Sequence, residues 1–568
     1  MKANIQASYH AIKAVLIVLS FCLLSSLPLS AQTPWAKKSA GAVFTLKTFA
    51  ADGSLLGSSN GFFVGDNGDA VSCFTPFKNA QRAVVIDNQG KEMDVEYLLG
   101  ANDTYDVAKF HVATKKSTAL PIARQSAGQA TAWLLPYAAK KQPTCIQGNV
   151  TGEEHFQEKY DYYTLNMTTE EQHVGCPVVN DAGEAIGILQ PSAGNQPNTS
   201  HAVSAAFAAD LRMTGLSLND PSLRLTAIAK ALPDSYDEAL LSLYMAAAAM
   251  DEQQYSEYLE RFIQQFPNAS DGYVYRARAK TAKGDFAGAD ADLKQAVKVA
   301  EKKDDAHYQY AQLVYQKAVY QDTTPYEPWS LDLALQESQQ AYAINPQPVY
   351  RQQQAQILFA QKKYEDAYST YLSLVGTELN TADLYYAASQ CKLQQGDRDA
   401  SLALLDSAVN TFTKPFVKTA APYLIARAQA LFEAGKYRSA VNDYNDYEQL
   451  MSAQLTPTFY YLREQAEMKG HLFQQALDDI RRAVQMAPTE SLYLAEQASV
   501  ELRVGMTDEA LATARQCIAI APDQSEGYLL LGLAQCVKGQ KAEGLQNLSK
   551  AKELGNDQAQ SLIDKYSK

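Results

Sequence analysis

The feature that most constrains the fold is a repeat of 34 residues in the second half of the 568-residue chain. Ala476, Ala510 and Gly544 follow one another at this interval, each before a leucine, and Pro488 and Pro522 are separated by the same step. Each unit also has an aromatic or aliphatic residue, a glycine turn and a second small residue, with helical spacing between them. A repeat of this length indicates helix pairs that bury their apolar faces only by stacking on neighbours. The sequence therefore predicts an all-α solenoid here.

The pattern resembles the tetratricopeptide repeat, a helix-turn-helix unit that stacks into a superhelix. Residues 528–532 with Gly539, and residues 435–440, are good instances of its motif. We predict about eight repeats between residues 220 and 568, followed by a C-terminal capping helix. Two insertions, at 320–329 and 412–416, interrupt the period. Insertions in such arrays map to one face and can contribute to binding.

The resemblance implies a concave groove, lined by the first helix of each repeat, that holds a protein or peptide partner. Aligning the repeats on their small residues places five glutamines at one groove position and three tyrosines at a second. These residues are Gln312, Gln356, Gln390, Gln429, Gln465, Tyr308, Tyr386 and Tyr461. Primary amides both donate and accept, so the glutamines could pair with a ligand backbone, and the tyrosines could anchor it. The alternative is a solvated surface, because glutamine is also a good helix former.

Residues 32–215 have a different character. Runs of β-branched and aromatic residues at 43–47, 61–64 and 83–86 are each followed by a turn rich in Gly, Asp or Asn. Many short strands at this spacing predict an all-β barrel or sandwich. The natural boundary with the helical half is Asn219-Asp220-Pro221, where Asp220 can cap a helix and Pro221 suits its first turn.

The segment 173–188 reads His-Val-Gly-Cys-Pro-Val-Val-Asn and then, from 183, Gly-Glu-Ala-Ile-Gly-Ile. It resembles the nucleophile loop of trypsin-like serine proteases, and the resemblance implies a double β-barrel. The alignment puts Val174 at the nucleophilic serine and Thr75 at the histidine, and it retains Asp106 as the aspartate. Valine has no atom that attacks a carbonyl, and threonine is no base, so we predict that triad catalysis is lost. Further matching segments lie at 59–64, 69–76, 102–108 and 200–204.

A cysteine peptidase is the alternative, with Cys176 as nucleophile and His173 or His201 as base. The register disfavours it, because it places Cys176 two residues beyond the nucleophile position. A buried structural cysteine, or a disulfide between Cys73 and Cys176, fits the register better, and export would permit the bond. We therefore expect no catalytic residue.

The first 31 residues resemble a secretory signal peptide. Lys2 and Lys13 precede an apolar run at 14–24 that is too short to span a bilayer. Residues 29–31 form a plausible cleavage site for a signal peptidase. An uncleaved anchor is the alternative, while a lipid attachment at Cys22 is disfavoured by the bulky Phe21. We expect an exported protein, without a membrane span after cleavage, in the periplasm, on the outer membrane or secreted, from a Gram-negative bacterium.

The net charge and the cysteine and histidine spacing limit which partners and cofactors are expected. The formal charge is −13 and no block of Lys or Arg occurs, so nucleic acid and anionic lipid are poor partners. No cysteine or histidine spacing suggests a metal site, and we expect no cofactor. The sequence thus predicts an exported protein-binding scaffold or adaptor. The alternatives are a peptidase with residual activity and a barrel that serves only as a folding cap.

Overall fold

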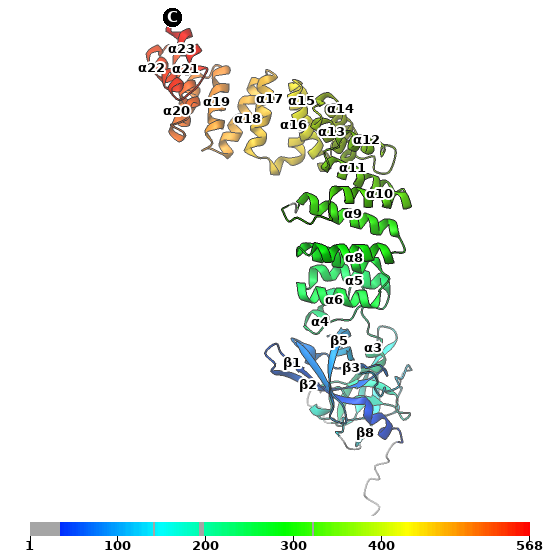
Figure 1. The fold of residues 1–568 in the computed structure, drawn as a ribbon. Coiled ribbons are helices and arrows are strands. Elements are labelled where there is room, and N and C mark those ends of the chain that lie inside the picture. Colours follow the sequence, from blue (N-terminus) through cyan, green and yellow to red (C-terminus); the bar gives the residue numbers. More distant parts are fainter. Residues whose placement is uncertain (1–33, 126, 140–142, 192–197, 321–322) are drawn as a thin grey trace, which may run out of the picture. The chain divides into compact units, whose positions relative to one another are not determined.

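The computed structural model describes residues 34–125, 127–139, 143–191, 198–320 and 323–568 (Figure 1). The signal peptide predicted at 1–31 lies outside the described residues. The chain divides into two compact units, one ending at Arg276 and one beginning at Ala277. Two closed barrels followed by helices confirm the predicted fold class.

The first barrel is closed by six antiparallel strands in the order β1-β2-β3-β6-β5-β4. Its interior is filled by large apolar side chains, among them Phe44, Phe62 and Phe110, which are completely buried. The strands are β1 (Val43–Phe49), β2 (Leu55–Phe63), β3 (Asp69–Ser72), β4 (Arg82–Ile86), β5 (Glu92–Asn102) and β6 (Val107–Val112).

The second barrel has the same plan, in the order β10-β11-β12-β9-β8-β7. Between β10 and β11 the Asn180 side chain accepts backbone N–H bonds from Ala182 and Glu184, and Gly183 adopts a φ of +82°, which completes the turn. The strands are β7 (Thr131–Leu134), β8 (Ile146–Phe156), β9 (Tyr160–Asn166), β10 (Pro177–Val179), β11 (Ala185–Leu189) and β12 (Thr199–Ser204). Short helices α2 (Ala36–Ser39) and α3 (Ala205–Asp210) flank the barrels.

The predicted helix start at the domain boundary is present. α4 (Pro221–Arg224) begins with Pro221, and the Asp220 carboxylate accepts the Ser222 backbone N–H at 2.7 Å. Beyond α4 the chain pairs with the first barrel: Ala231 donates to the Leu98 carbonyl at 2.9 Å, and Leu98 donates to Ala229 at 2.8 Å. This connector, residues 225–235 between α4 and α5, extends the first unit past the strands.

The first two long helices belong to the same unit. They are α5 (Tyr236–Ala249) and α6 (Glu252–Gln265). From α6, Arg261 donates to the Lys230 carbonyl at 3.1 Å and Gln265 donates to the Pro233 carbonyl at 2.9 Å. These bonds attach the helix pair to the connector. They explain why the compact unit ends at Arg276, whereas the change from strands to helices occurs near residue 220.

The second unit consists of helices that pack in sequence, each against the next. Between paired helices the chain turns at glycines with positive φ, including Gly396, Gly435, Gly505 and Gly539. The helices are α7 (Ser270–Ala282), which crosses the unit boundary, α8 (Phe286–Val299), α9 (Lys303–Tyr320), α10 (Leu331–Ile344), α11 (Pro348–Ala360), α12 (Tyr364–Leu372), α13 (Ala382–Gln394), α14 (Arg398–Asn410), α15 (Ala421–Glu433), α16 (Tyr437–Met451), α17 (Pro457–Lys469), α18 (Phe473–Met486), α19 (Ser491–Arg503), α20 (Thr507–Ile520), α21 (Ser525–Val537), α22 (Lys541–Glu553) and α23 (Ala559–Ser567). In the described part of the chain, no helix has the length and apolar character that crossing a bilayer requires.

The first predicted insertion is anchored where the structure describes it. Trp329 is buried and its indole N–H donates to Asp290 Oδ1 at 2.9 Å, while its ring packs against Tyr326 and Phe286. Tyr326 and Trp329 of the insertion therefore pack against α8.

Candidate functional site

Two of the three predicted triad positions, Thr75 and Asp106, are hydrogen-bonded to each other. Asp106 Oδ1 accepts the backbone N–H of Thr75 at 2.6 Å, and the Asp106 carbonyl accepts the Phe74 N–H at 3.2 Å. Asp106 adopts a φ of +49°, which is uncommon for a residue with a side chain. Asp106 thus fixes the turn that begins at Thr75, the residue that the alignment places at the histidine position.

Val174, which the alignment places at the nucleophile position, lies at the end of a single 3-10 turn formed by Glu171–His173. The Val174 N–H donates to the Glu171 carbonyl at 3.1 Å. In serine proteases the N–H of the nucleophile helps to bind the oxyanion of the tetrahedral intermediate. Here that donor is already used. The Val174 carbonyl accepts two bonds from Asn60, from its backbone at 2.9 Å and its amide at 3.1 Å.

Cys176 has the environment of an inert thiol. Its side chain is completely buried, and burial raises the pKa of the thiol to about 12. The histidine that precedes it in sequence is engaged elsewhere, since His173 Nδ1 accepts the Glu170 N–H at 3.1 Å. His201 stacks on Tyr162, with ring centroids 5.8 Å apart. A thiol that stays protonated at neutral pH is a poor nucleophile.

The two cysteines of the predicted disulfide lie in one hydrophobic core. Cys73 and Cys176 are both free and buried. The Cys73 thiol points to the Leu189 carbonyl at 3.8 Å, and burial followed by the nearby Asp106 carboxylate raises its pKa well above the usual range. The pairing of the two cysteines stays a prediction.

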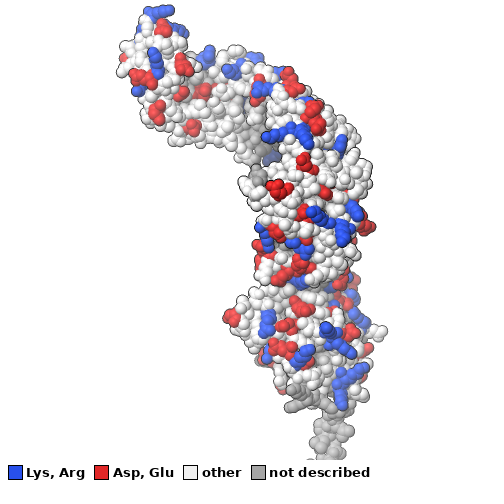
Figure 2. Space-filling model, viewed as in Figure 1, with Lys and Arg blue, Asp and Glu red and all other residues white. Residues whose placement is uncertain are grey.

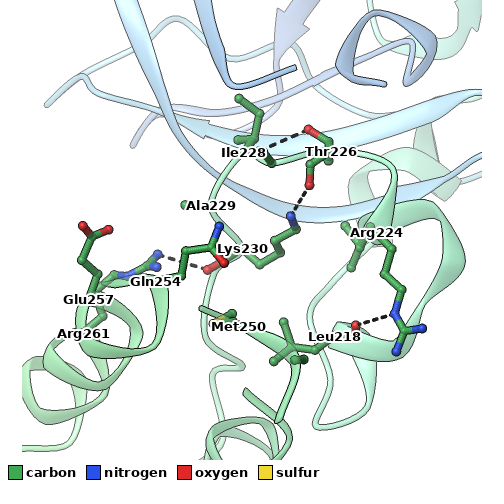
Figure 3. Close-up of a pocket in the computed structure, with 13 residues that line it drawn as sticks. Leu218, Arg224, Thr226, Ile228, Ala229, Lys230, Met250, Gln254, Glu257 and Arg261 are labelled. Carbon is green, nitrogen blue, oxygen red and sulfur yellow. Dashed lines mark hydrogen bonds between the residues drawn. The ribbon is translucent and has the colours of Figure 1, made fainter. Parts of the chain in front are cut away.

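A cavity of about 550 Å³ lies beside the first barrel, between the connector and α5–α6 (Figure 3). Its walls include Ile228 and Met250, and Lys230 reaches across it to donate to the Thr226 carbonyl at 2.5 Å. Burial lowers the pKa of the Lys230 amine to about 8. Sequence analysis missed this residue, although a lysine within the apolar run 227–232 was a visible signal.

The predicted groove residues fall on five successive odd-numbered helices, α9, α11, α13, α15 and α17. Among the glutamines, Gln356 and Gln429 are exposed, and Gln312, Gln390 and Gln465 are half-buried. Each amide therefore occupies the first helix of its pair, as the alignment requires. That the position faces a ligand stays a prediction.

Each of the three predicted tyrosines contacts a tyrosine of the next odd-numbered helix. The ring centroids are 5.2 Å apart for Tyr308 and Tyr350, and 5.5 Å apart for Tyr461 and Tyr493. Tyr386, 36% exposed, lies 6.0 Å from its partner ring on α15. These rings therefore contribute to packing between repeats, and only part of each surface is open.

A smaller cavity of about 260 Å³ lies at one of the predicted groove residues, Gln465. Glu464, on α17, and Glu496, on α19, both line it, and neither was singled out from the sequence. Elsewhere, on the face that Figure 2 shows, Lys and Arg side chains are interspersed with Asp and Glu and form no separate basic patch. Among the described residues, no group of His, Cys, Asp and Glu is arranged to hold a metal ion.

Comparison with known proteins supports both halves of this description. Residues 59–188, which span strands of both barrels, match the family model for a trypsin-like peptidase domain. The chain is 28% identical over 87 residues to the small glutamine-rich tetratricopeptide repeat-containing protein 2 of Saccharomyces cerevisiae, a match covering 15% of this chain and 25% of that protein. It is 30% identical over 86 residues to the TPR repeat-containing thioredoxin TDX of Arabidopsis thaliana, covering 15% of this chain and 23% of that one.

Among solved structures, the active form of the Rv3671c protease from M. tuberculosis is similar at 16% identity, covering 36% of this chain and 88% of that chain with a TM-score of 0.29. The chain spans about a quarter of the length of the curated relatives it matches. It therefore combines a trypsin-like peptidase domain with a helical region similar to tetratricopeptide-repeat proteins.

Proposed function

We propose that this chain is an exported protein-binding scaffold, in which the solenoid holds a protein partner and the trypsin-like domain does not cleave peptide bonds. The observation that carries the loss of activity is the state of Val174, which offers no nucleophile and whose N–H is bonded to Glu171. Removing nucleophile and base together leaves little of the rate enhancement of such an enzyme.

Binding is supported by the similarity to tetratricopeptide-repeat proteins and by the amides repeated on successive first helices. Solenoids present extended surfaces of this kind to partner proteins. Export is proposed from the signal-like segment at 1–31, and it places the protein in the periplasm or beyond it. Sequencing the mature N-terminus tests export, since cleavage should expose a residue near Gln32.

Hydrolysis is tested by incubating residues 32–568 with denatured casein, with and without reductant, beside a Cys176→Ala variant. We expect no cleavage under either condition. Cleavage that the variant loses would make Cys176 a nucleophile and overturn the proposal.

Binding is tested by placing a photo-cross-linking amino acid at Gln356 or Gln429 in cells. The matched controls carry it at Ser369 on α12 or Asn442 on α16, which are exposed on second helices. We expect cross-linked partner proteins from the glutamine positions only. Cross-links confined to the control positions, or none at all, would contradict binding along the first helices.

A further inference from the structure

Glu464 breaks the pattern of its repeat position. In the neighbouring repeats the residue before each predicted groove glutamine is small. These residues are Ala311, Ala355, Ser389 and Ala428, which precede Gln312, Gln356, Gln390 and Gln429. Two further steps of 34 residues from position 464 reach Ala498 and Gly532, which are also small. These positions are buried where helices pass closely; a Cβ on Gly532 would lie 2.8 Å from the Gly544 carbonyl oxygen. In the repeat of α17 the position holds a glutamate, completely buried.

The Glu464 carboxyl is only half satisfied. Its Oε2 accepts the Gln465 amide N–H at 2.7 Å, whereas its buried Oε1 has no hydrogen-bond donor among the residues that the structure describes. Burial, and then the carboxyl of Glu496, raise the pKa of Glu464 to about 8. A buried polar atom without a partner is costly and is rare in folded proteins. This oxygen is therefore a position where a donor from outside the chain would be stabilising.

A second carboxyl lines the same cavity from the next repeat. Burial raises the pKa of Glu496, while a hydrogen bond from Gln465 lowers it, so one amide contacts both acids. The cavity walls between them include Met468 and Phe473. The cavity thus combines an acidic end with an apolar side, and its volume of about 260 Å³ is below that of a typical small-molecule site. It suits a single long side chain.

The remaining lining residues carry the opposite charge. Lys469, His471 and Arg503 are exposed and line the cavity together with the buried carboxyl of Glu464. Such an arrangement attracts acidic residues to the opening while the interior accepts a donor. A ligand that matches both features carries one cation between acidic neighbours.

We propose that this cavity binds the ammonium group of a lysine side chain flanked by acidic residues, presented by the protein partner of the solenoid. The inference rests on the proposed function. An ammonium has three donors, enough for Glu464 Oε1, the Glu496 carboxyl and one further acceptor. Its methylene chain would pack on Met468 and Phe473, as lysine stems do on apolar surfaces.

The test uses residues 32–568 with ¹³C-labelled methionine methyl groups, so that the Met468 methyl reports on the cavity. The probe is acetyl-Asp-Lys-Asp-amide, and the matched control replaces lysine by norleucine, which has the same chain without the ammonium. We expect a saturable shift of the Met468 resonance with the lysine peptide. The norleucine peptide should bind about tenfold or more weakly, because a charge-assisted hydrogen bond is lost.

Glu464→Gln should weaken the lysine peptide to a similar degree, and so should Glu496→Gln on the neighbouring helix. Glu543→Gln, exposed on α22, is the control and should bind as the parent does. Equal binding of the two peptides, binding by both cavity variants as tight as that of the parent, or an unshifted Met468 methyl would overturn the inference. Cross-links from Gln356 that persist in that case would show that only the lysine site has failed and that the solenoid still binds protein.

Discussion

Replacing Lys230 by methionine tests whether the connector beside the first barrel buries a charged amine at a cost. The Lys230 amine donates to the Thr226 carbonyl at 2.5 Å, and burial lowers its pKa from 10.5 to about 8. Methionine keeps the length of the chain and removes the charge. The variant should therefore gain stability where the amine of the parent is charged in both the folded and unfolded states.

The magnitude follows from the shift. Between pH 8 and 10.5 the unfolded amine binds a proton that the folded one has released, so the stability of the parent rises with pH across this window. The shift implies a penalty of about 3 kcal/mol at pH 7 that falls to about 1 kcal/mol at pH 10. Losing the hydrogen bond to Thr226 costs the variant about 1–2 kcal/mol at either pH. Lys230→Met should then be more stable than the parent at pH 7 by about 1–2 kcal/mol, and no more stable at pH 10.

The measurement is urea unfolding followed by tryptophan fluorescence, in a Trp329→Phe background. Of the three tryptophans in the chain, Trp35 and Trp133 then remain, and both indoles donate to Asp181 in the barrel region. Substituting the exposed Lys91 by methionine is the control, with an expected change below about 0.5 kcal/mol. A difference between Lys230→Met and the parent that is the same at pH 7 and pH 10 would refute the lowered pKa of Lys230.

Three further substitutions probe other parts of the chain. Arg463 is buried and donates to both carboxylate oxygens of Asp479, at 2.6 and 2.8 Å. Arg463→Met should therefore destabilise the solenoid by about 3–5 kcal/mol, measured by unfolding followed with helical circular dichroism. An equal effect from Arg482→Met, the exposed control, would contradict this. Gly175 has a φ of +83°, and an added Cβ would lie 2.0 Å from the Asn60 carbonyl oxygen. Gly175→Ala should therefore lower the urea midpoint of unfolding measured by barrel tryptophan fluorescence. An unchanged midpoint would show that the loop can relax. The Cys176 thiol should react with iodoacetamide about 100-fold more slowly in the native protein than in urea, measured by peptide mass spectrometry, and equal rates would contradict its burial.

The helices could be predicted because their signal is local and repeated. Glycine turns such as those at Gly435 and Gly505 recur together with small residues at a fixed spacing, so a few neighbouring residues are enough to identify each turn. The Asp220 cap was predicted for the same reason, since the carboxylate bonds an N–H only two residues away. The barrels required the resemblance, because alternating strands do not determine which strands pair across the barrel.

The side chains that the sequence did not reveal depend on contacts between distant residues. Lys230 is buried because Arg261, 31 residues further on, holds α6 against its carbonyl. The pairing of Glu464 with Glu496 depends on how α17 meets α19. The disulfide between Cys73 and Cys176 stays a prediction for a related reason: an alignment does not show where thiols point, and the Cys73 thiol points to the Leu189 carbonyl.

The barrel pair also shows why a family match does not by itself establish the chemistry of a family. Asp106 accepts a bond from the Thr75 backbone N–H, which every residue except proline would supply at that position. The loop that would present a nucleophile is held by Asn60, whose amide donates to the Gln172 carbonyl at 2.7 Å and to that of Val174 at 3.1 Å. These bonds stabilise the fold irrespective of which side chains occupy the catalytic positions. Retention of the framework is therefore explained by stability alone, and the proposed loss of activity rests on Thr75 and Val174, which the alignment places at the base and nucleophile positions.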